Sequence, residues 1–116
     1  MSLHSPVVSV IMPCFNQGRY LDEAIASVLA QTLTSVEIIV IDDGSTEETT
    51  VRLLENYQRP HTTVLRTANR GPSAARNAGI QQAKGQYIFP LDADDRIAPT
   101  YLEQAVSVLE ADPNIG

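Results

Sequence analysis

The chain has 116 residues, of which 43% are hydrophobic and 19% charged, as expected for one globular domain with a single core. Its formal net charge of −6 argues against a nucleic-acid partner, because proteins that bind nucleic acid usually present a basic face. The single cysteine excludes an internal disulfide, and the sequence shows neither a signal peptide nor an apolar run of about 20 residues, so we expect a cytoplasmic domain without a membrane segment.

Apolar and amphipathic segments alternate along the chain. Runs rich in β-branched residues predict strands, whereas apolar residues three and four positions apart predict helices. In chain order, strands are expected at 7–12, 36–41, 62–66 and 86–91, and helices at 18–31, 46–57, 71–84 and 98–112. We expect Pro13 to end the first strand, Ser45 to cap the second helix, and Pro90 to mark an irregular or edge position in the fourth strand.

This alternation of strands and helices predicts a Rossmann-like α/β fold, a parallel β-sheet of about four strands with helices on both faces. Residues 7–116 would form this domain, after a flexible tail at 1–6. In such a sheet every strand-to-helix loop lies at the carboxyl edge, where ligands bind. Those loops read PCFNQG, DDGST, ANRGPS and DADDR, and the loops at the other edge are plain by comparison. The sequence therefore predicts a binding site along one edge, without identifying its ligand.

The loop after the fourth strand carries three carboxylates within four positions, Asp92, Asp94 and Asp95. Asp92 and Asp94 can both reach one ion if the local backbone turns, and an all-oxygen ligand set favours Mg²⁺ or Mn²⁺. The alternative is a solvated turn in which Asp95 caps the following helix. We assign Asp92 and Asp94 as metal ligands and leave Asp95 open between a supporting role and a cap.

Two further loops offer groups that suit a nucleotide. Asp42 and Asp43 stand at a strand end, where a carboxylate can accept a hydrogen bond from a ribose hydroxyl or a base N–H, or can form a turn and a helix cap. Arg76 suits bidentate contact with a phosphate, and backbone N–H groups near Gly71 could hold an anion. A lone arginine on a helix, however, usually faces solvent.

The loop after the first strand contains Phe15, which could stack on a base or plug the sheet edge, and Asn16, which could bind a ligand or cap a helix. Cys14 is expected to be a small buried residue, because no histidine lies near it in the sequence to activate it. The sequence contains no GxxxxGK, GxGxxG or GxSxG motif, so the common ATPase, dehydrogenase and hydrolase interpretations are excluded. Acidic residues after the second and fourth strands also do not match a phospho-receiver domain.

Three runs of sequence together resemble the N-terminal, nucleotide-sugar-binding part of a family 2 glycosyltransferase of the GT-A fold: VSVIMPCFNQGRYLDEAIASVLAQT, VEIIVIDDGSTEET and NRGPSAARNAGIQQAKGQYIFPLDADD. The resemblance extends over essentially all of 8–112. It implies an inverting transferase that moves a sugar from a nucleotide-sugar, usually a UDP-sugar, to a saccharide, lipid or protein acceptor with Mg²⁺ or Mn²⁺. The alternative is a non-catalytic nucleotide-binding or interaction domain of the same fold.

The resemblance also implies site residues. Asp92 and Asp94 would bind the metal, and Asp92 the donor as well; the other nucleotide-sugar-binding residues would be Pro13, Phe15, Asn16, Asp42, Asp43, Gly71, Arg76 and Asn77. In the family, the catalytic base and the acceptor site normally follow the metal motif, and no residue here is a good candidate for the base. We therefore expect a fragment of a longer transferase that is inactive alone and prone to dimerise through an uncovered sheet edge. Whether the full-length protein associates with a membrane stays open.

Overall fold

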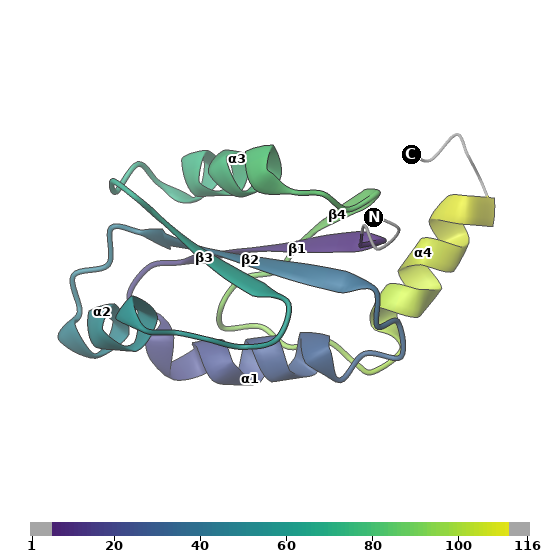
Figure 1. The fold of residues 1–116 in the computed structure, drawn as a ribbon, viewed down its shortest axis with the longest axis horizontal. Helices are drawn as coiled ribbons and strands as arrows, with labels where there is room; N and C mark the ends of the chain where they lie inside the picture. Colours follow the sequence, from purple (N-terminus) through teal and green to yellow (C-terminus); the bar gives the residue numbers. More distant parts are fainter. Residues whose placement is uncertain (1–5, 112–116) are drawn as a thin grey trace.

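The computed structural model describes residues 6–111, so nearly all of the predicted tail and the last five residues lie outside the described part. The predicted alternation is confirmed (Figure 1). The strands are β1 (Val8–Cys14), β2 (Val36–Asp43), β3 (Thr62–Thr67) and β4 (Tyr87–Pro90), and the helices are α1 (Gly18–Leu29), α2 (Glu48–Glu55), α3 (Pro72–Gln82) and α4 (Tyr101–Ala111).

The four strands form one parallel sheet in the order β3-β2-β1-β4, as predicted. Among the described residues β4 is an edge strand, which is where its proline is tolerated. The first strand does not end at Pro13, as we expected, but continues to Cys14. Pairing of β1 with β4 stops at Ile11, so beyond that residue β1 keeps only β2 as a partner, and the missing N–H of Pro13 interrupts no pairing with β4.

Each face of the sheet has its own apolar core, because successive side chains of a strand point to opposite faces. Figure 1 shows α3 alone on one face and α1 and α2 on the other, with α4 near the amino ends of the strands. The larger core joins the α1 face of the sheet to three helices and includes Val10, Met12, Leu21, Ile25, Ile38, Val40, Leu54 and Leu102. The smaller core lies under α3 and consists of Ile11, Ile39, Ile41 and Ala75.

Helix α3 lies unusually close to the sheet. A Cβ atom on Gly79 would lie 2.7 Å from Cδ1 of Ile41 and 2.8 Å from Cγ2 of Ile11, so only glycine allows this approach. The helix, expected to start at residue 71, begins at the carboxyl edge of the sheet with Gly71 as its N-cap residue and Pro72 in its first turn, where proline is favoured. The close packing therefore fixes the amino end of α3 beside the loops that carry the unusual polar residues.

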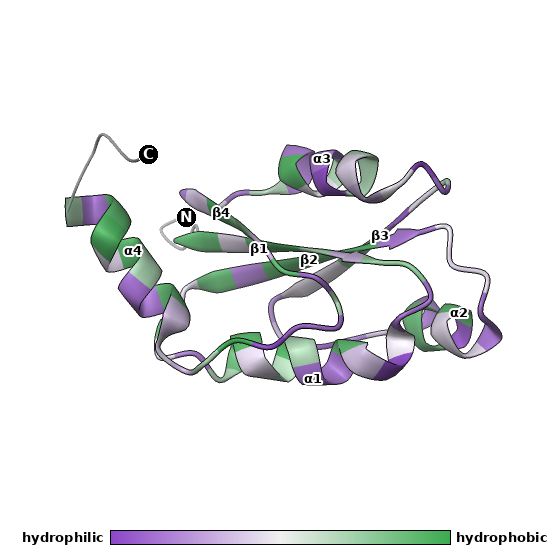
Figure 2. Cartoon of the chain, turned by 180° about the vertical axis from the view of Figure 1, so that it is seen from behind, coloured by the Kyte–Doolittle hydropathy of each residue, from purple (hydrophilic) through white to green (hydrophobic). Residues whose placement is uncertain are grey.

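Hydropathy follows the same division between core and edge. Figure 2 shows β1 largely in green and the loop that follows β4 largely in purple. Within residues 6–111, no helix combines the length and the apolar character needed to span a bilayer.

Candidate functional site

A hollow of about 380 Å³ lies at the carboxyl edge of the sheet. It draws residues from the carboxyl ends of the four strands or from the loops that follow them, as the topology of a parallel sheet requires. Its lining consists of Pro13, Cys14, Phe15, Gln17, Asp43, Asn69, Gly71, Pro72, Arg76, Asp92 and Asp94. We refer to this hollow as the edge pocket.

The acidic loop forms one wall of the edge pocket. Asp92, Asp94 and Asp95 each offer a carboxylate oxygen, and the three atoms lie within 4.8 Å of one another. The backbone N–H of Asp95 donates to the carbonyl of Asp92 at 3.0 Å, which is the turn that brings the carboxylates together. All three side chains are exposed, and Asp92 and Asp94 line the pocket. Three clustered carboxylate oxygens form a donor set suited to a hard divalent cation such as Mg²⁺ or Mn²⁺.

Arg76 supplies a positive charge beside these carboxylates. Its Nη2 lies 3.7 Å from Oδ1 of Asp92, and both side chains are well exposed to solvent. An exposed pair at this distance holds its partners weakly, so the guanidinium is available to a negatively charged ligand. Asn77, the next residue on α3, is exposed and does not line the edge pocket, because adjacent residues of a helix point in different directions.

Asp43 lies on the floor of the edge pocket and is only 4% exposed. Its Oδ1 accepts hydrogen bonds from the hydroxyl of Thr67 at 3.1 Å and the N–H of Arg70 at 3.0 Å, and its Oδ2 accepts one from the N–H of Gly71 at 3.0 Å. This carboxylate therefore fixes the loop between β3 and α3, including the N-cap residue of the helix. One lone pair of Oδ2 stays free of these bonds.

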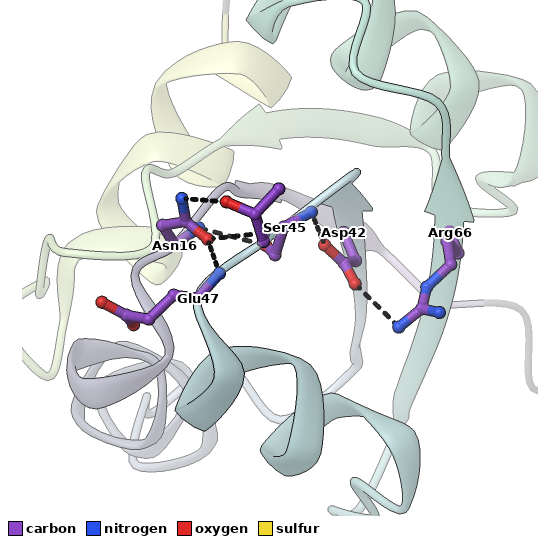
Figure 3. Close-up of polar contacts among 6 residues, drawn as sticks. Asn16, Asp42, Ser45, Glu47 and Arg66 are labelled. Atoms are coloured by element: carbon purple, nitrogen blue, oxygen red, sulfur yellow. Dashed lines mark hydrogen bonds and ion pairs between the residues drawn. The ribbon is translucent and has the colours of Figure 1, made fainter.

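Asp42 points to the opposite face of the sheet, since successive residues of β2 alternate. It lines a different hollow, between α2 and β3, and not the edge pocket. Its Oδ1 accepts from the N–H of Ser45 at 2.9 Å, and Arg66 lies 3.3 Å from Oδ2 (Figure 3). Of the acidic pair, Asp43 is thus the residue that faces the pocket, a choice that the sequence pattern left open.

Asn16 also lies outside the lining of the edge pocket. Its side-chain oxygen accepts hydrogen bonds from the N–H groups of Thr46 and Glu47, just before α2 (Figure 3). Ser45, expected as the cap of this helix, is instead part of the preceding turn, and the N-cap residue is Glu47. The N-cap residue Glu47 makes no side-chain capping bond, so the side-chain oxygen of Asn16, from the loop after β1, accepts hydrogen bonds from the N–H groups at the start of α2.

Four pocket residues were not predicted: Cys14, Gln17, Asn69 and Pro72. All four belong to the loops that the sequence pattern had marked, but they carry no charge that would single them out. Cys14 is fully buried, and this burial raises the pKa of its thiol to about 11. The thiol is therefore protonated at neutral pH, which agrees with the expectation of an unreactive buried residue.

The end of α1 supports the segment that follows the acidic loop. The side chain of Gln31, 3% exposed, donates to the carbonyl of Ala98 at 2.6 Å and accepts from the N–H of Leu102 at 3.0 Å. The hydroxyl of Ser27 accepts from the N–H of Ile97 at 3.3 Å. These bonds hold the segment between the acidic loop and α4 against the end of α1. Nothing in the sequence indicated this role, because Gln31 stands there only as a polar residue at the end of a predicted helix.

The comparison with protein families decides to which family this chain belongs. The family model described as "Glycosyl transferase family 2" matches residues 9–116. The chain belongs to glycosyl transferase family 2. Among the family's curated proteins, the uncharacterized glycosyltransferase YibD of Escherichia coli is 42% identical over 112 residues, which cover 93% of this chain and 32% of YibD.

Solved structures in complex with nucleotides share the fold. TarS of S. aureus (residues 1–349, in complex with UDP) superposes with a TM-score of 0.77 at 31% identity, over 90% of this chain and 32% of that one. The mannosyltransferase PcManGT of Pyrobaculum calidifontis, in complex with GDP-Man and Mn²⁺, gives 0.79 at 30% identity, over 93% and 33%. The four-stranded α/β arrangement is therefore that of the GT-A fold, and the chain spans about a third of the length of these relatives.

Proposed function

We propose that this chain is the donor-binding part of a longer glycosyltransferase, which transfers a sugar from a nucleotide-sugar to an acceptor with inversion and with a divalent cation. The observation that carries the proposal is the composition of the edge pocket. It places an aromatic ring, a buried carboxylate, a guanidinium beside a helix amino end, and two further carboxylates around one hollow. A nucleoside diphosphate presents matching groups: a base, a ribose and two phosphates.

The matching follows from charge and shape. Phe15, 41% exposed, offers a face on which a base can stack, and the free lone pair of Asp43 can accept from a base N–H. Arg76 and the amino end of α3 suit the negative phosphates. Uracil carries such an N–H, as does guanine; we favour a UDP-sugar because UDP is the ligand bound to TarS.

Asp92 and Asp94 would hold the cation, with Asp95 completing the cluster of carboxylates. A bound Mg²⁺ or Mn²⁺ supplies Lewis-acid stabilisation of the charge that grows on the leaving diphosphate. Mn²⁺ accompanies GDP-Man in the PcManGT structure, which supports a divalent cation as part of donor binding in this fold. The chain's own residues bind and orient the donor: Arg76 offsets phosphate charge, and Asp43, by holding the N–H groups of Arg70 and Gly71, fixes the loop that places the amino end of α3 beside the phosphates.

The proposal is tested by calorimetric titration of UDP and GDP into the 116-residue chain, with and without Mn²⁺. We expect Asp94→Asn to reduce the Mn²⁺-dependent gain in UDP affinity by about tenfold or more, because the cluster loses one anionic ligand. Glu48→Gln is the matched control, since it removes one negative charge from an exposed pair with Arg52 on α2, away from the pocket. Equal losses in both variants, or UDP binding that ignores Mn²⁺, would contradict the proposal.

A further inference from the structure

The loop after β1 is tied to the loop after β2 through the single residue Asn16 (Figure 3). Its side-chain oxygen accepts from the N–H groups of Thr46 at 2.9 Å and Glu47 at 2.7 Å, and its side-chain nitrogen donates to the hydroxyl of Thr46 at 3.2 Å. Its backbone N–H donates to the hydroxyl of Ser45 at 3.0 Å. Both polar atoms of the amide are thus engaged within the protein and are directed away from the edge pocket.

The backbone of Asn16 has the opposite handedness from its neighbours. Its φ is 55°, in the left-handed region that asparagine tolerates better than most residues. The residues on either side, Phe15 and Gln17, both line the edge pocket. Because the Phe15 ring is 41% exposed, packing alone does not fix it, and its position depends on the turn made at Asn16.

Asp42 continues the same connection from the other face of the sheet. It is 1% exposed, and its Oδ1 accepts from the N–H of Ser45, the residue whose hydroxyl holds Asn16. Its Oδ2 is buried and has no hydrogen-bond partner within the described residues; Arg66, with a side chain 59% exposed, lies 3.3 Å away. A buried carboxylate satisfied so incompletely costs stability, so packing alone does not account for an aspartate here.

We propose that Asn16 and Asp42 are positioning residues for the donor pocket and do not contact the donor. Asp42 fixes the turn at Ser45, and Ser45 and its neighbours fix Asn16. Asn16 in turn sets Phe15 against the strand end that carries Asp43, and so sets the width of the nucleoside side of the pocket. The inference rests on the proposed function, because it concerns the site at which the nucleotide would bind.

The test compares Asn16→Gly with Asn16→Asp. Glycine adopts the same φ without strain and loses only the side-chain bonds, whereas aspartate keeps an acceptor for the N–H groups of Thr46 and Glu47. We expect Asn16→Gly to weaken UDP binding in Mn²⁺ by about tenfold, the equivalent of one lost capping interaction, and to leave the affinity for pyrophosphate within about twofold. We expect Asn16→Asp to bind UDP within about threefold of the wild type.

Two controls separate positioning from general loss of stability. Val106→Ala removes buried volume from α4, far from the pocket, and should lower stability without changing the affinity for UDP. Arg52→Gln removes an exposed charge from α2 and should also bind UDP like the wild type, whereas Asp42→Ala removes the acceptor of the Ser45 N–H and should weaken UDP binding in the same direction as Asn16→Gly. In the absence of nucleotide, amide hydrogen exchange at Thr46 and Glu47 should accelerate in Asn16→Gly and not in Asn16→Asp.

The outcomes distinguish this inference from the function on which it rests. Wild-type UDP binding that Asn16→Gly leaves intact would overturn the inference alone. So would an equal loss in Asn16→Asp, the result expected if the amide itself touched the donor. A wild-type chain that binds no UDP in Mn²⁺ would overturn the proposed function, and the positioning role with it, whatever the exchange rates show.

Discussion

Replacing Asp43 by asparagine should weaken both the fold and the pocket, although the two side chains have nearly the same shape. Asp43 accepts hydrogen bonds from Thr67, Arg70 and Gly71, and it is buried. If the asparagine side chain places its oxygen where Oδ1 lies, the bonds from Thr67 and Arg70 are kept. The NH₂ group then faces the N–H of Gly71, and because both groups are donors the third bond is lost. Losing one hydrogen bond to a charged, buried acceptor costs about 1.5–3 kcal/mol.

Urea unfolding measures this cost. With an m-value of about 1–3 kcal/mol/M, Asp43→Asn should lower the midpoint by about 0.5–3 M. Asp42→Asn is the matched control: its oxygen can keep the bond from Ser45, and it loses only a contact with the exposed Arg66, so its free energy of unfolding should change by less than about 1 kcal/mol. If both variants lost the same stability, or if Asp43→Asn were neutral, the assignment of Asp43 as the residue that fixes the β3–α3 loop would be refuted.

Three further predictions concern other parts of the structure. Arg76→Gln should weaken UDP binding by about tenfold and uridine binding by much less, because in the proposed donor site the guanidinium would contact the phosphates; Arg52→Gln, which removes the same charge from α2, should leave both unchanged in calorimetry. Gly79→Ala should destabilise the chain by about 1–3 kcal/mol in urea, since its Cβ would lie within 2.8 Å of two isoleucines, and a gain from helix propensity would contradict this packing. Burial raises the pKa of the Cys14 thiol from 9.0 to about 11, so the thiol stays protonated in the folded chain at pH values where it ionises in the unfolded chain. The free energy of unfolding is therefore unaffected below pH 9 and falls between pH 9 and 11, by roughly 2–3 kcal/mol. Burial also raises the pKa of Tyr57, which titrates in the same direction, so the free energy of unfolding must be compared between the wild type and Cys14→Ala. It should fall less with pH in Cys14→Ala; identical pH profiles of the two proteins would show that the thiol does not contribute.

The sequence was sufficient to predict the order of elements and the edge at which the polar loops meet. The apolar runs of β1 and β2 and the glycine and proline at the amino end of α3 are local signals, and each reflects what the backbone of that segment can adopt. The gathering of Phe15, Arg76 and Asp92 around one hollow then follows from parallel topology.

What the sequence could not provide is the direction of individual side chains. Asp42 and Asp43 are adjacent and chemically identical, and only the phase of β2, which continues two residues further than predicted, decides which one faces the pocket. Asn16 was predicted to line the pocket, but its partners lie about 30 residues away in the sequence, beyond the reach of any local pattern. The bonds that Gln31 makes with the segment before α4 have the same long-range character.

The central claim is that a divalent ion joins the acidic loop to the diphosphate of a nucleotide. It is tested most directly by the affinity of the wild-type chain for UDP and for uridine, each measured by calorimetry with and without Mn²⁺. We predict that Mn²⁺ strengthens UDP binding by at least about tenfold and changes uridine binding by less than about twofold, because only UDP carries phosphate oxygens for the ion. A Mn²⁺ effect that is absent for UDP, or equal for the two ligands, would contradict the claim.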